Sequence, residues 1–157
     1  MEAVTAIDRA SITELNSLIK LHVRAIAAYE TAIARLENRD YKAKLVEFLQ
    51  DHRRQVKIFT TTVQRLGGTP SKGSDVRRIL AQGKVLLADM LGNDITIMKA
   101  TKLNEDITNI KYEKALRRCS KELHDLLARH RESEQRHNTW LLSTLASEPQ
   151  KNTGVPR

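Results

Sequence analysis

The chain has 157 residues, enough for one domain that buries about two-thirds of its unfolded surface. A single cysteine excludes a disulfide framework and a cysteine-rich zinc site, and 4% aromatic residues leave little material for base stacking. The formal charge of +8 indicates a solvated basic face or attraction to acidic partners.

Apolar residues spaced alternately three and four apart predict an all-α fold, and strand-type alternation is not visible. The first long helix is predicted over residues 11–38, opening at a capping box of Ser11 and Glu14. A second runs from an N-cap at Asp40 to about residue 66, where two glycines and a proline end it.

A crossover with a shorter helix over residues 74–91 should follow the first hairpin. Such a helix spans about 27 Å, long enough to return along the whole bundle. The second helix and a further one over 95–118 should then run parallel, before a last helix from Ser120 to about 147. The predicted organisation is an N-terminal extension over 1–10, a four-helix bundle over 11–147 and a disordered tail over 148–157.

The last predicted helix carries ionisable residues on the face that should be buried. Its stripe reads Leu123, Leu127, His130, Glu134, His137, Leu141 and Leu145. Burying such groups without partners is costly. A metal ion is one compensation, because Glu-x-x-His is a metal-binding spacing in helical bundles. A core salt-bridged by Arg54, Arg129 or Arg136 is the other.

The other helices supply further polar groups at a similar height. Glu30 falls on the apolar stripe of the first helix, and His52 interrupts that of the second. Counting about 1.5 Å per residue brings Glu105 to the same level. His22 we interpret as a hydrogen-bonded core histidine. The metal-ligand candidates are Glu30, His52, Glu105, His130, Glu134 and His137.

A weak internal repeat leaves one of these choices open. Tyr29-Glu30 followed by Ala32-Ile33 recurs as Tyr112-Glu113 followed by Ala115-Leu116. Two copies of a helical hairpin would produce this match, as would shared amphipathic patterning. The repeat favours Glu113 as the partner of Glu30, whereas the height count favours Glu105.

Six short motifs are shared with a known superfamily. They are Leu15-Asn16-Ser17-Leu18-Ile19, Tyr29-Glu30, Leu66-Gly67-Gly68-Thr69-Pro70, Gly92-Asn93-Asp94, Asn104-Glu105-Asp106 and Tyr112-Glu113. Through them residues 12–146 resemble the ferritin-like superfamily, and more narrowly an uncharacterised, stress-associated bacterial branch of it. The resemblance implies a four-helix bundle with a crossover segment and a dinuclear metal centre between helices. Its implied ligands are Glu30, Asp51, Glu105 or Glu113, Glu134 and His137.

The second helix departs from the superfamily's pattern. Where a ferritin-like helix has Glu-x-x-His, this chain reads Asp51-His52-Arg53-Arg54, and an arginine cannot bind a cation as a ligand. The departure argues against a ferroxidase centre and iron storage. A one-metal site and a metal-free core held by ion pairs both stay open.

Two functions therefore remain. In the first, a ferritin-like bundle binds iron or another divalent metal and serves in stress, with oxidation of ferrous ion as its reaction if it is redox-active. In the second, the bundle is a non-enzymatic basic interaction module with a vestigial, metal-free polar core. No nucleophile motif or phosphate-binding glycine loop predicts metal-free catalysis, and we assign no catalytic residue.

The expected partners are a metal ion, a second copy of the chain and, through the basic surface, an acidic partner or nucleic acid. No apolar run approaches the roughly 20 residues that cross a bilayer, and the N-terminus lacks the apolar region of a signal peptide. We therefore expect a cytoplasmic protein with no membrane association.

Overall fold

The computed structural model describes residues 5–71, 78 and 92–148, and every regular element in these ranges is helical. The helices are α1 (Ala6–Arg35), α2 (Arg39–Arg65), α4 (Asp94–Arg118), the one-turn 3₁₀ helix η1 (Lys121–Leu123) and α5 (His124–Ser147). The all-α prediction is confirmed for these ranges. The short helix expected over 74–91 lies, apart from position 78, outside the described residues, as does the predicted tail beyond residue 148.

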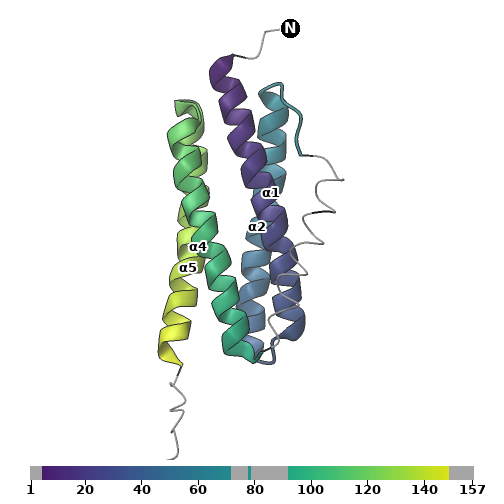
Figure 1. Ribbon diagram of the computed structural model, residues 1–157, viewed down its shortest axis with the longest axis vertical. Helices are drawn as coiled ribbons and strands as arrows, with labels where there is room; N and C mark the ends of the chain where they lie inside the picture. The colour runs from purple at the N-terminus through teal and green to yellow at the C-terminus, as the bar shows by residue number, and fades with distance from the viewer. Residues whose placement is uncertain (1–4, 72–77, 79–91, 149–157) are drawn as a thin grey trace, which may run out of the picture.

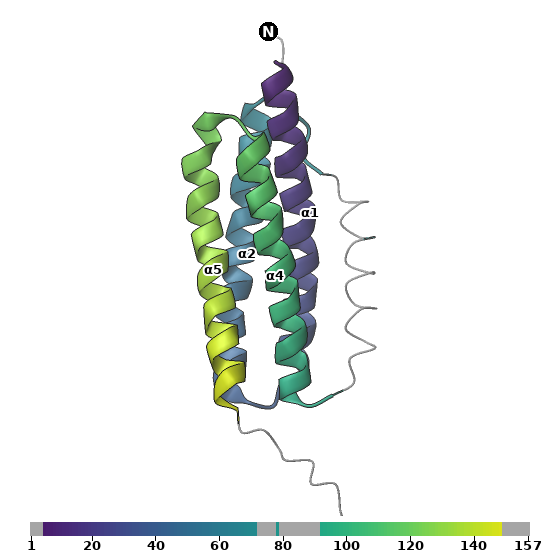
Figure 2. The same cartoon turned by 60° about the vertical axis from the view of Figure 1, so that its left-hand side comes forward.

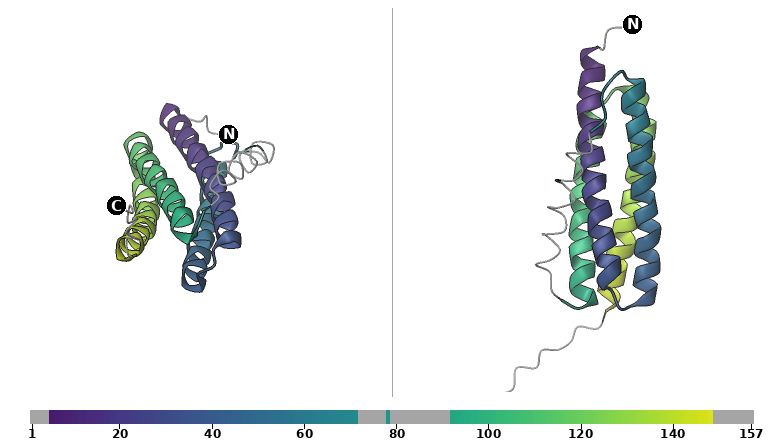
Figure 3. Two further views of the ribbon diagram at one scale, coloured as in Figure 1. Left: turned by 60° about the horizontal axis from the view of Figure 1, so that its bottom comes forward. Right: turned by 90° about the vertical axis from the view of Figure 1, so that its right-hand side faces the viewer.

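The long helices form two antiparallel hairpins that lie side by side, α1–α2 and α4–α5 (Figures 1 and 2). An oblique view shows one hairpin beside the other (Figure 3). α1 packs against both α2 and α4, and α4 packs against α5. Because α2 ends at one end of the bundle and α4 begins at the other, these two helices run parallel, as predicted. None of the described helices is long and apolar enough to cross a membrane.

The start of α1 differs from the prediction. The helix begins at Ala6 rather than at Ser11, because Thr5 is its N-cap and forms a capping box with Asp8. The Ser11 hydroxyl instead accepts a hydrogen bond of 3.0 Å from the backbone N–H of Ser120. Ser11 therefore links α1 to the junction between α4 and α5.

The opposite end of the bundle is held together by Asp94, in the first turn of α4. Its carboxylate accepts hydrogen bonds from the backbone N–H groups of Glu37, at 2.9 Å, and Asn38, at 2.8 Å. Asn38 is also the N-cap of α2, where Asp40 was expected, and its side chain accepts from the N–H groups of Asp40 and Tyr41. One carboxylate thus connects the α1–α2 turn to α4.

The end of α2 depends on two glycines. Gly67 has a φ of 79°, a left-handed conformation that residues with a Cβ rarely adopt. A Cβ on Gly68 would lie 2.8 Å from the side chain of Ile12, so only glycine lets the chain pass this close to α1. Asn16 then fixes the next residues, donating to the carbonyl of Thr69 at 3.0 Å and accepting from the N–H of Ser71 at 2.9 Å.

Two apolar clusters fill the interior, one toward each end of the bundle. The first includes Leu15, Leu18, Ile19, Phe59, Val63 and Leu127, and the second includes Leu36, Leu45, Phe48, Met98 and Leu141. Between them every long helix contributes a buried polar residue: His22 from α1, His52 from α2, Glu105 from α4 and Glu134 from α5. The protein therefore has a polar layer enclosed by two apolar ones.

Replacing Asp94 with Ala should lower the free energy of unfolding by about 2 kcal/mol, because two backbone N–H groups lose a charged acceptor. Asp125→Ala is the matched control. Asp125 also lies in the first turn of its helix but is exposed, so its loss should cost about 0.5 kcal/mol. Urea denaturation followed by circular dichroism measures both values. Equal losses in the two variants would contradict the role assigned to Asp94.

Candidate metal centre

Four buried side chains from three helices converge in the polar layer. They are His52 of α2, Glu105 of α4, and Glu134 and His137 of α5. Each offers one potential ligand atom, and these atoms all lie within 4.8 Å of one another. His137 is 2% exposed and the other three are fully buried. Such a group of oxygen and imidazole nitrogen donors can surround a single cation.

The contacts of this cluster leave half of its polar side-chain atoms without a hydrogen bond. His52 Nε2 lies 3.1 Å from Glu105 Oε1, which is hydrogen-bonding distance. The Nδ1 atom of His137 lies 3.6 Å from Glu105 Oε1 and 3.7 Å from Glu134 Oε2, too far for a good hydrogen bond. The atoms left without a partner are Glu105 Oε2, both carboxylate oxygens of Glu134 and His137 Nδ1. Buried acceptors without donors are costly, so the arrangement favours a cation.

The outer nitrogen of His137 is held in place by Asp51. His137 Nε2 lies 2.9 Å from Asp51 Oδ2 and donates a hydrogen bond to it, so in the neutral ring the lone pair of Nδ1 is directed toward the cluster. The imidazole also stacks on Phe48, with ring centroids 4.0 Å apart. A carboxylate behind a histidine is the arrangement that orients imidazole ligands in metal sites.

His52 is oriented by a chain of hydrogen bonds that ends at a tyrosine. Its Nδ1 lies 2.8 Å from His22 Nδ1, and His22 Nε2 lies 2.6 Å from the hydroxyl of Tyr112. Imidazole tautomers let this chain run in two directions. When Tyr112 donates to His22, His52 Nε2 carries a proton and donates to Glu105. In the reverse direction His52 donates to His22, and its Nε2 lone pair is free to bind a cation.

Glu105 is fixed from the side of α1. The hydroxyl of Tyr29, which is 1% exposed, donates a hydrogen bond to Glu105 Oε1. Burial and the Glu105 charge together raise the pKa of Tyr29 well above its usual value, so the phenol stays protonated as a donor. The hydroxyl therefore holds the carboxylate in position.

Burial and the neighbouring charges shift the pKa values of the cluster in opposite directions. Burial disfavours the ionised form of Glu105, but His52 and His137 outweigh it and hold the pKa of Glu105 well below its usual value. Burial raises the pKa of Glu134, and the charge of His52 offsets this only in part. Burial lowers the pKa of His137, yet Glu105 and Glu134 more than reverse this and raise it to about 9. Without a cation, protons on the imidazoles balance the carboxylates.

The structure places two of the predicted ligands outside this cluster. Glu30 is about half exposed, at 48% of its side chain, and pairs with Arg53 at 2.8 Å. The buried seam of α1 passes through Tyr29 rather than Glu30, which turns the carboxylate outward. His130 is half-buried one turn before Glu134, with its ring against the edge of Phe59 at 5.2 Å between centroids.

The structure places Glu105, and not Glu113, in this cluster. Glu105 is fully buried in the cluster, as the count of heights along the helices predicted. Glu113 is 49% exposed and forms an ion pair of 2.9 Å with Arg131. The predicted salt-bridged core is not seen either, since Arg54 and Arg136 are 67% and 66% exposed and Arg129 is exposed too.

Two tyrosines of the site were not among the predicted residues. Tyr29 and Tyr112 are both fully or almost fully buried, and each phenol contacts a residue of the polar layer. The repeated Tyr-Glu pairs of the sequence contained the signal. In each repeated pair it is the tyrosine that contacts the polar layer. The glutamates that follow, Glu30 and Glu113, both point outward.

In chelator-treated protein, we expect the free energy of unfolding to fall as the pH rises from 6.5 toward 9. The pKa of His137 is raised from 6.5 to about 9 in the folded state, so its stabilisation is fully present below pH 6.5 and is lost as the pH rises through about 9. The full effect is on the order of 3 kcal/mol. Urea denaturation at a series of pH values measures it.

His137→Gln should remove most of this pH dependence, because the amide does not titrate. His124→Gln is the matched control, since His124 lies at the start of the same helix and outside the cluster. An unchanged slope in His137→Gln, or no slope in the unsubstituted protein, would show that the imidazole is not held by the two carboxylates.

One family model matches most of this chain. The family model described as "Domain of unknown function (DUF2383)" matches residues 10–118. No curated protein and no solved structure matches the chain. The matched span contains His52 and Glu105 and ends with α4, so Glu134 and His137 lie beyond it. Because the match covers well over half of the sequence, the chain belongs to the DUF2383 family.

Proposed function

We propose that this protein is a ferritin-like bundle that binds one divalent metal ion, such as iron, in its core. The observation that carries the proposal is the set of buried polar atoms without partners: three carboxylate oxygens and His137 Nδ1. A divalent cation among two carboxylates and two neutral imidazoles leaves no net charge in the interior. Carboxylate and imidazole donors suit iron, manganese and zinc.

The surrounding groups support a metal rather than a proton as the compensating charge. Asp51 orients His137 from behind, and His22 does the same for His52. Both contacts leave one imidazole nitrogen directed at the cluster. A carboxylate in the position of Asp51 is a usual outer partner of a metal-bound histidine.

The ligand set favours one ion over the dinuclear centre that the ferritin-like resemblance implies. The four donors close around one point, and Glu30 and Glu113 pair with arginines at the surface. The position three residues after Asp51 is Arg54, which supplies no ligand.

Four protein ligands would leave further coordination positions on iron open. Open positions are the condition for redox activity at non-haem iron. A role in stress, in which oxygen or peroxide takes the electron from ferrous ion, is the physiological part of this proposal.

Chelator-treated protein should bind one equivalent of Zn²⁺, or of Fe²⁺ under anaerobic conditions, in isothermal titration calorimetry. At a free metal concentration of 100 times the Kd, binding stabilises the fold by about 2.7 kcal/mol. For a chain of this size that raises the Tm by about 5–10 °C. Glu134→Gln and His137→Leu should each abolish the shift, because each removes a ligand.

Glu30→Gln is the control, since Glu30 lies outside the cluster, and it should keep both stoichiometry and Tm shift. His137→Leu also separates the two functions that the sequence leaves open. Loss of the metal with a retained fold supports the metal site. A metal-free unsubstituted protein that His137→Leu leaves equally or more stable would instead support an interaction module with a polar network in its core.

Asp51→Asn should weaken metal binding by about 10–100-fold without changing the stoichiometry, because the asparagine orients His137 less strongly. Calorimetry on this variant measures the effect. Asp40→Asn, at an acidic residue in the first turn of α2, provides a control of equal charge change. Affinities that stay equal in the two variants would remove Asp51 from the site.

A further inference from the structure

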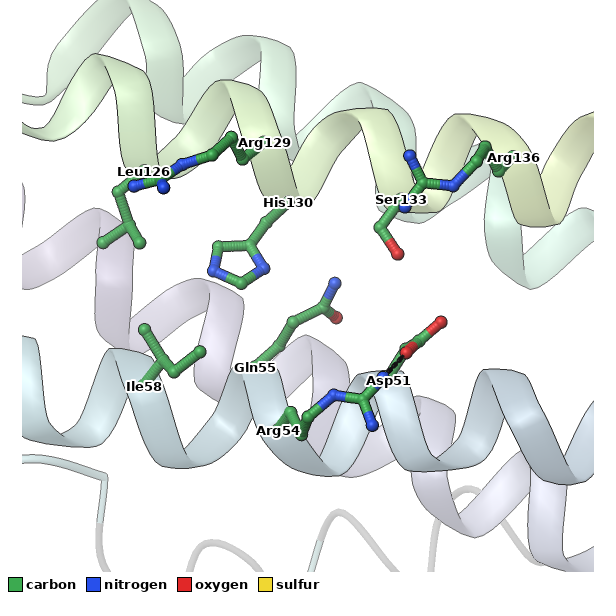
Figure 4. Close-up of a pocket in the computed structure, with 9 residues that line it drawn as sticks. All are labelled: Asp51, Arg54, Gln55, Ile58, Leu126, Arg129, His130, Ser133 and Arg136. Atoms are coloured by element: carbon green, nitrogen blue, oxygen red, sulfur yellow. Dashed lines mark hydrogen bonds and ion pairs between the residues drawn. The ribbon is translucent and has the colours of Figure 1, made fainter.

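A groove of about 400 Å³ lies between α2 and α5, outside the four-residue cluster. Side chains from both helices point into it (Figure 4). None of its lining residues belongs to the cluster, although Asp51, which supports His137, forms part of its wall. The groove is within the size range of small-molecule sites.

The middle of the groove contains a buried polar atom that has no hydrogen-bond partner. Gln55 is only 2% exposed, its amide points into the groove (Figure 4), and its Oε1 atom is buried without a hydrogen bond. The His130 ring lies across from it on α5. Burial and the charge of Arg129 lower the pKa of His130, which leaves a neutral ring able to donate or accept. A ligand could satisfy both side chains.

The charge of the lining is strongly positive. Arg54, Arg129 and Arg136 contribute three guanidinium groups, and among the described residues that line the groove Asp51 alone is acidic. Asp51 is already engaged by Arg54 and by His137. Arg136 is 66% exposed, and its nearest acidic group, that of Glu132, lies 3.8 Å away. Guanidinium groups bind carboxylates and phosphates through paired hydrogen bonds.

One end of the groove is lined by two apolar side chains, with Arg129 beside them (Figure 4). Ile58 of α2 and Leu126 of α5 face each other there, at the end away from Asp51 and Arg136 (Figure 4). Ile58 is 37% exposed, although it lies beside the half-buried Leu126. Arg54 and Arg136 carry the guanidinium groups of the other end, so the groove fits a ligand with an apolar body and an acidic head.

We propose that this groove binds a small organic oxyanion. The acidic head pairs with Arg54 and Arg136 and lies beside Ser133. Gln55 and His130 form hydrogen bonds with the middle of the ligand. Ile58 and Leu126 cover its apolar body. The site is formed by side chains that do not bind the proposed metal, so it stands whether or not the metal is present. Carboxylates and phosphate monoesters share the required head group.

The test uses hexanoate, hexyl phosphate, hexanol and inorganic phosphate as probes of the chelator-treated full chain. Titrations are followed by calorimetry and by the NMR signals of the histidine rings. We expect hexanoate or hexyl phosphate to bind saturably at one site and to shift the His130 ring but not the His124 ring. Hexanol and inorganic phosphate, which each lack one half of the ligand, should bind at least tenfold more weakly. Whichever of the two acids binds more tightly identifies the preferred head group.

Arg136→Gln should weaken the binding of the preferred acid by tenfold or more. The middle of the groove is tested with 3-hydroxyhexanoate, whose hydroxyl offers a donor to the unpaired Gln55 Oε1, and Gln55→Leu should weaken its binding by a similar factor. Arg117→Gln removes the same charge as Arg136→Gln, from the exposed face of α4, and should leave the binding of the preferred acid unchanged. Circular dichroism checks that each variant is folded, and Arg136 is at the surface, where a substitution affects folding least. The proposal is overturned if neither acid binds, if inorganic phosphate binds as well as both, or if Arg117→Gln weakens binding as much as Arg136→Gln. A cluster variant that loses the metal but still binds hexanoate would support a groove that is independent of the metal site.

Discussion

The burial of two carboxylates and two imidazoles at one level is the constraint on which the rest of this structure depends. Glu105 and Glu134 lose their hydration when the helices pack, and no arginine or lysine reaches them among the described residues. Only His52 and His137 are close enough to compensate. The interior must therefore hold either protons on the imidazoles or a cation, and each choice has consequences for stability and for function.

The apolar layers make this polar layer possible. Clusters on both sides exclude water from it, which strengthens every electrostatic interaction inside. Tyr29 and Tyr112 form part of these clusters through their rings, while their hydroxyls reach Glu105 and His22. Hydrophobic packing and orientation of the polar groups are thus carried by the same side chains. The tyrosines lock the geometry because their rings cannot move without disturbing the apolar core.

Sequence patterns predicted the buried faces of α2, α4 and α5 better than that of α1. On α5 the stripe through Glu134 and His137 is buried as its spacing indicates. On α1 the pattern after His22 allows a step to Ala25 or to Ile26, and both keep helical spacing. The structure takes the step to Ala25, which turns the buried face by one residue, or about 100°, and exposes Glu30. No local feature of the sequence distinguishes these choices, because both stripes are apolar enough to pack.

The sequence by itself determined the helical class, the four long helices, the parallel direction of α2 and α4, and the presence of ionisable groups in the core. These properties follow from the spacing of apolar residues and from helix length, which are local. Only the tertiary structure decided that Glu105 rather than Glu113 joins His52, that Asp51 lies behind His137, and that the groove with Gln55 opens between α2 and α5. Those relations depend on how each helix is rotated about its own axis against its neighbours. That rotation is set by the packing of all the helices together, so no single segment contains it.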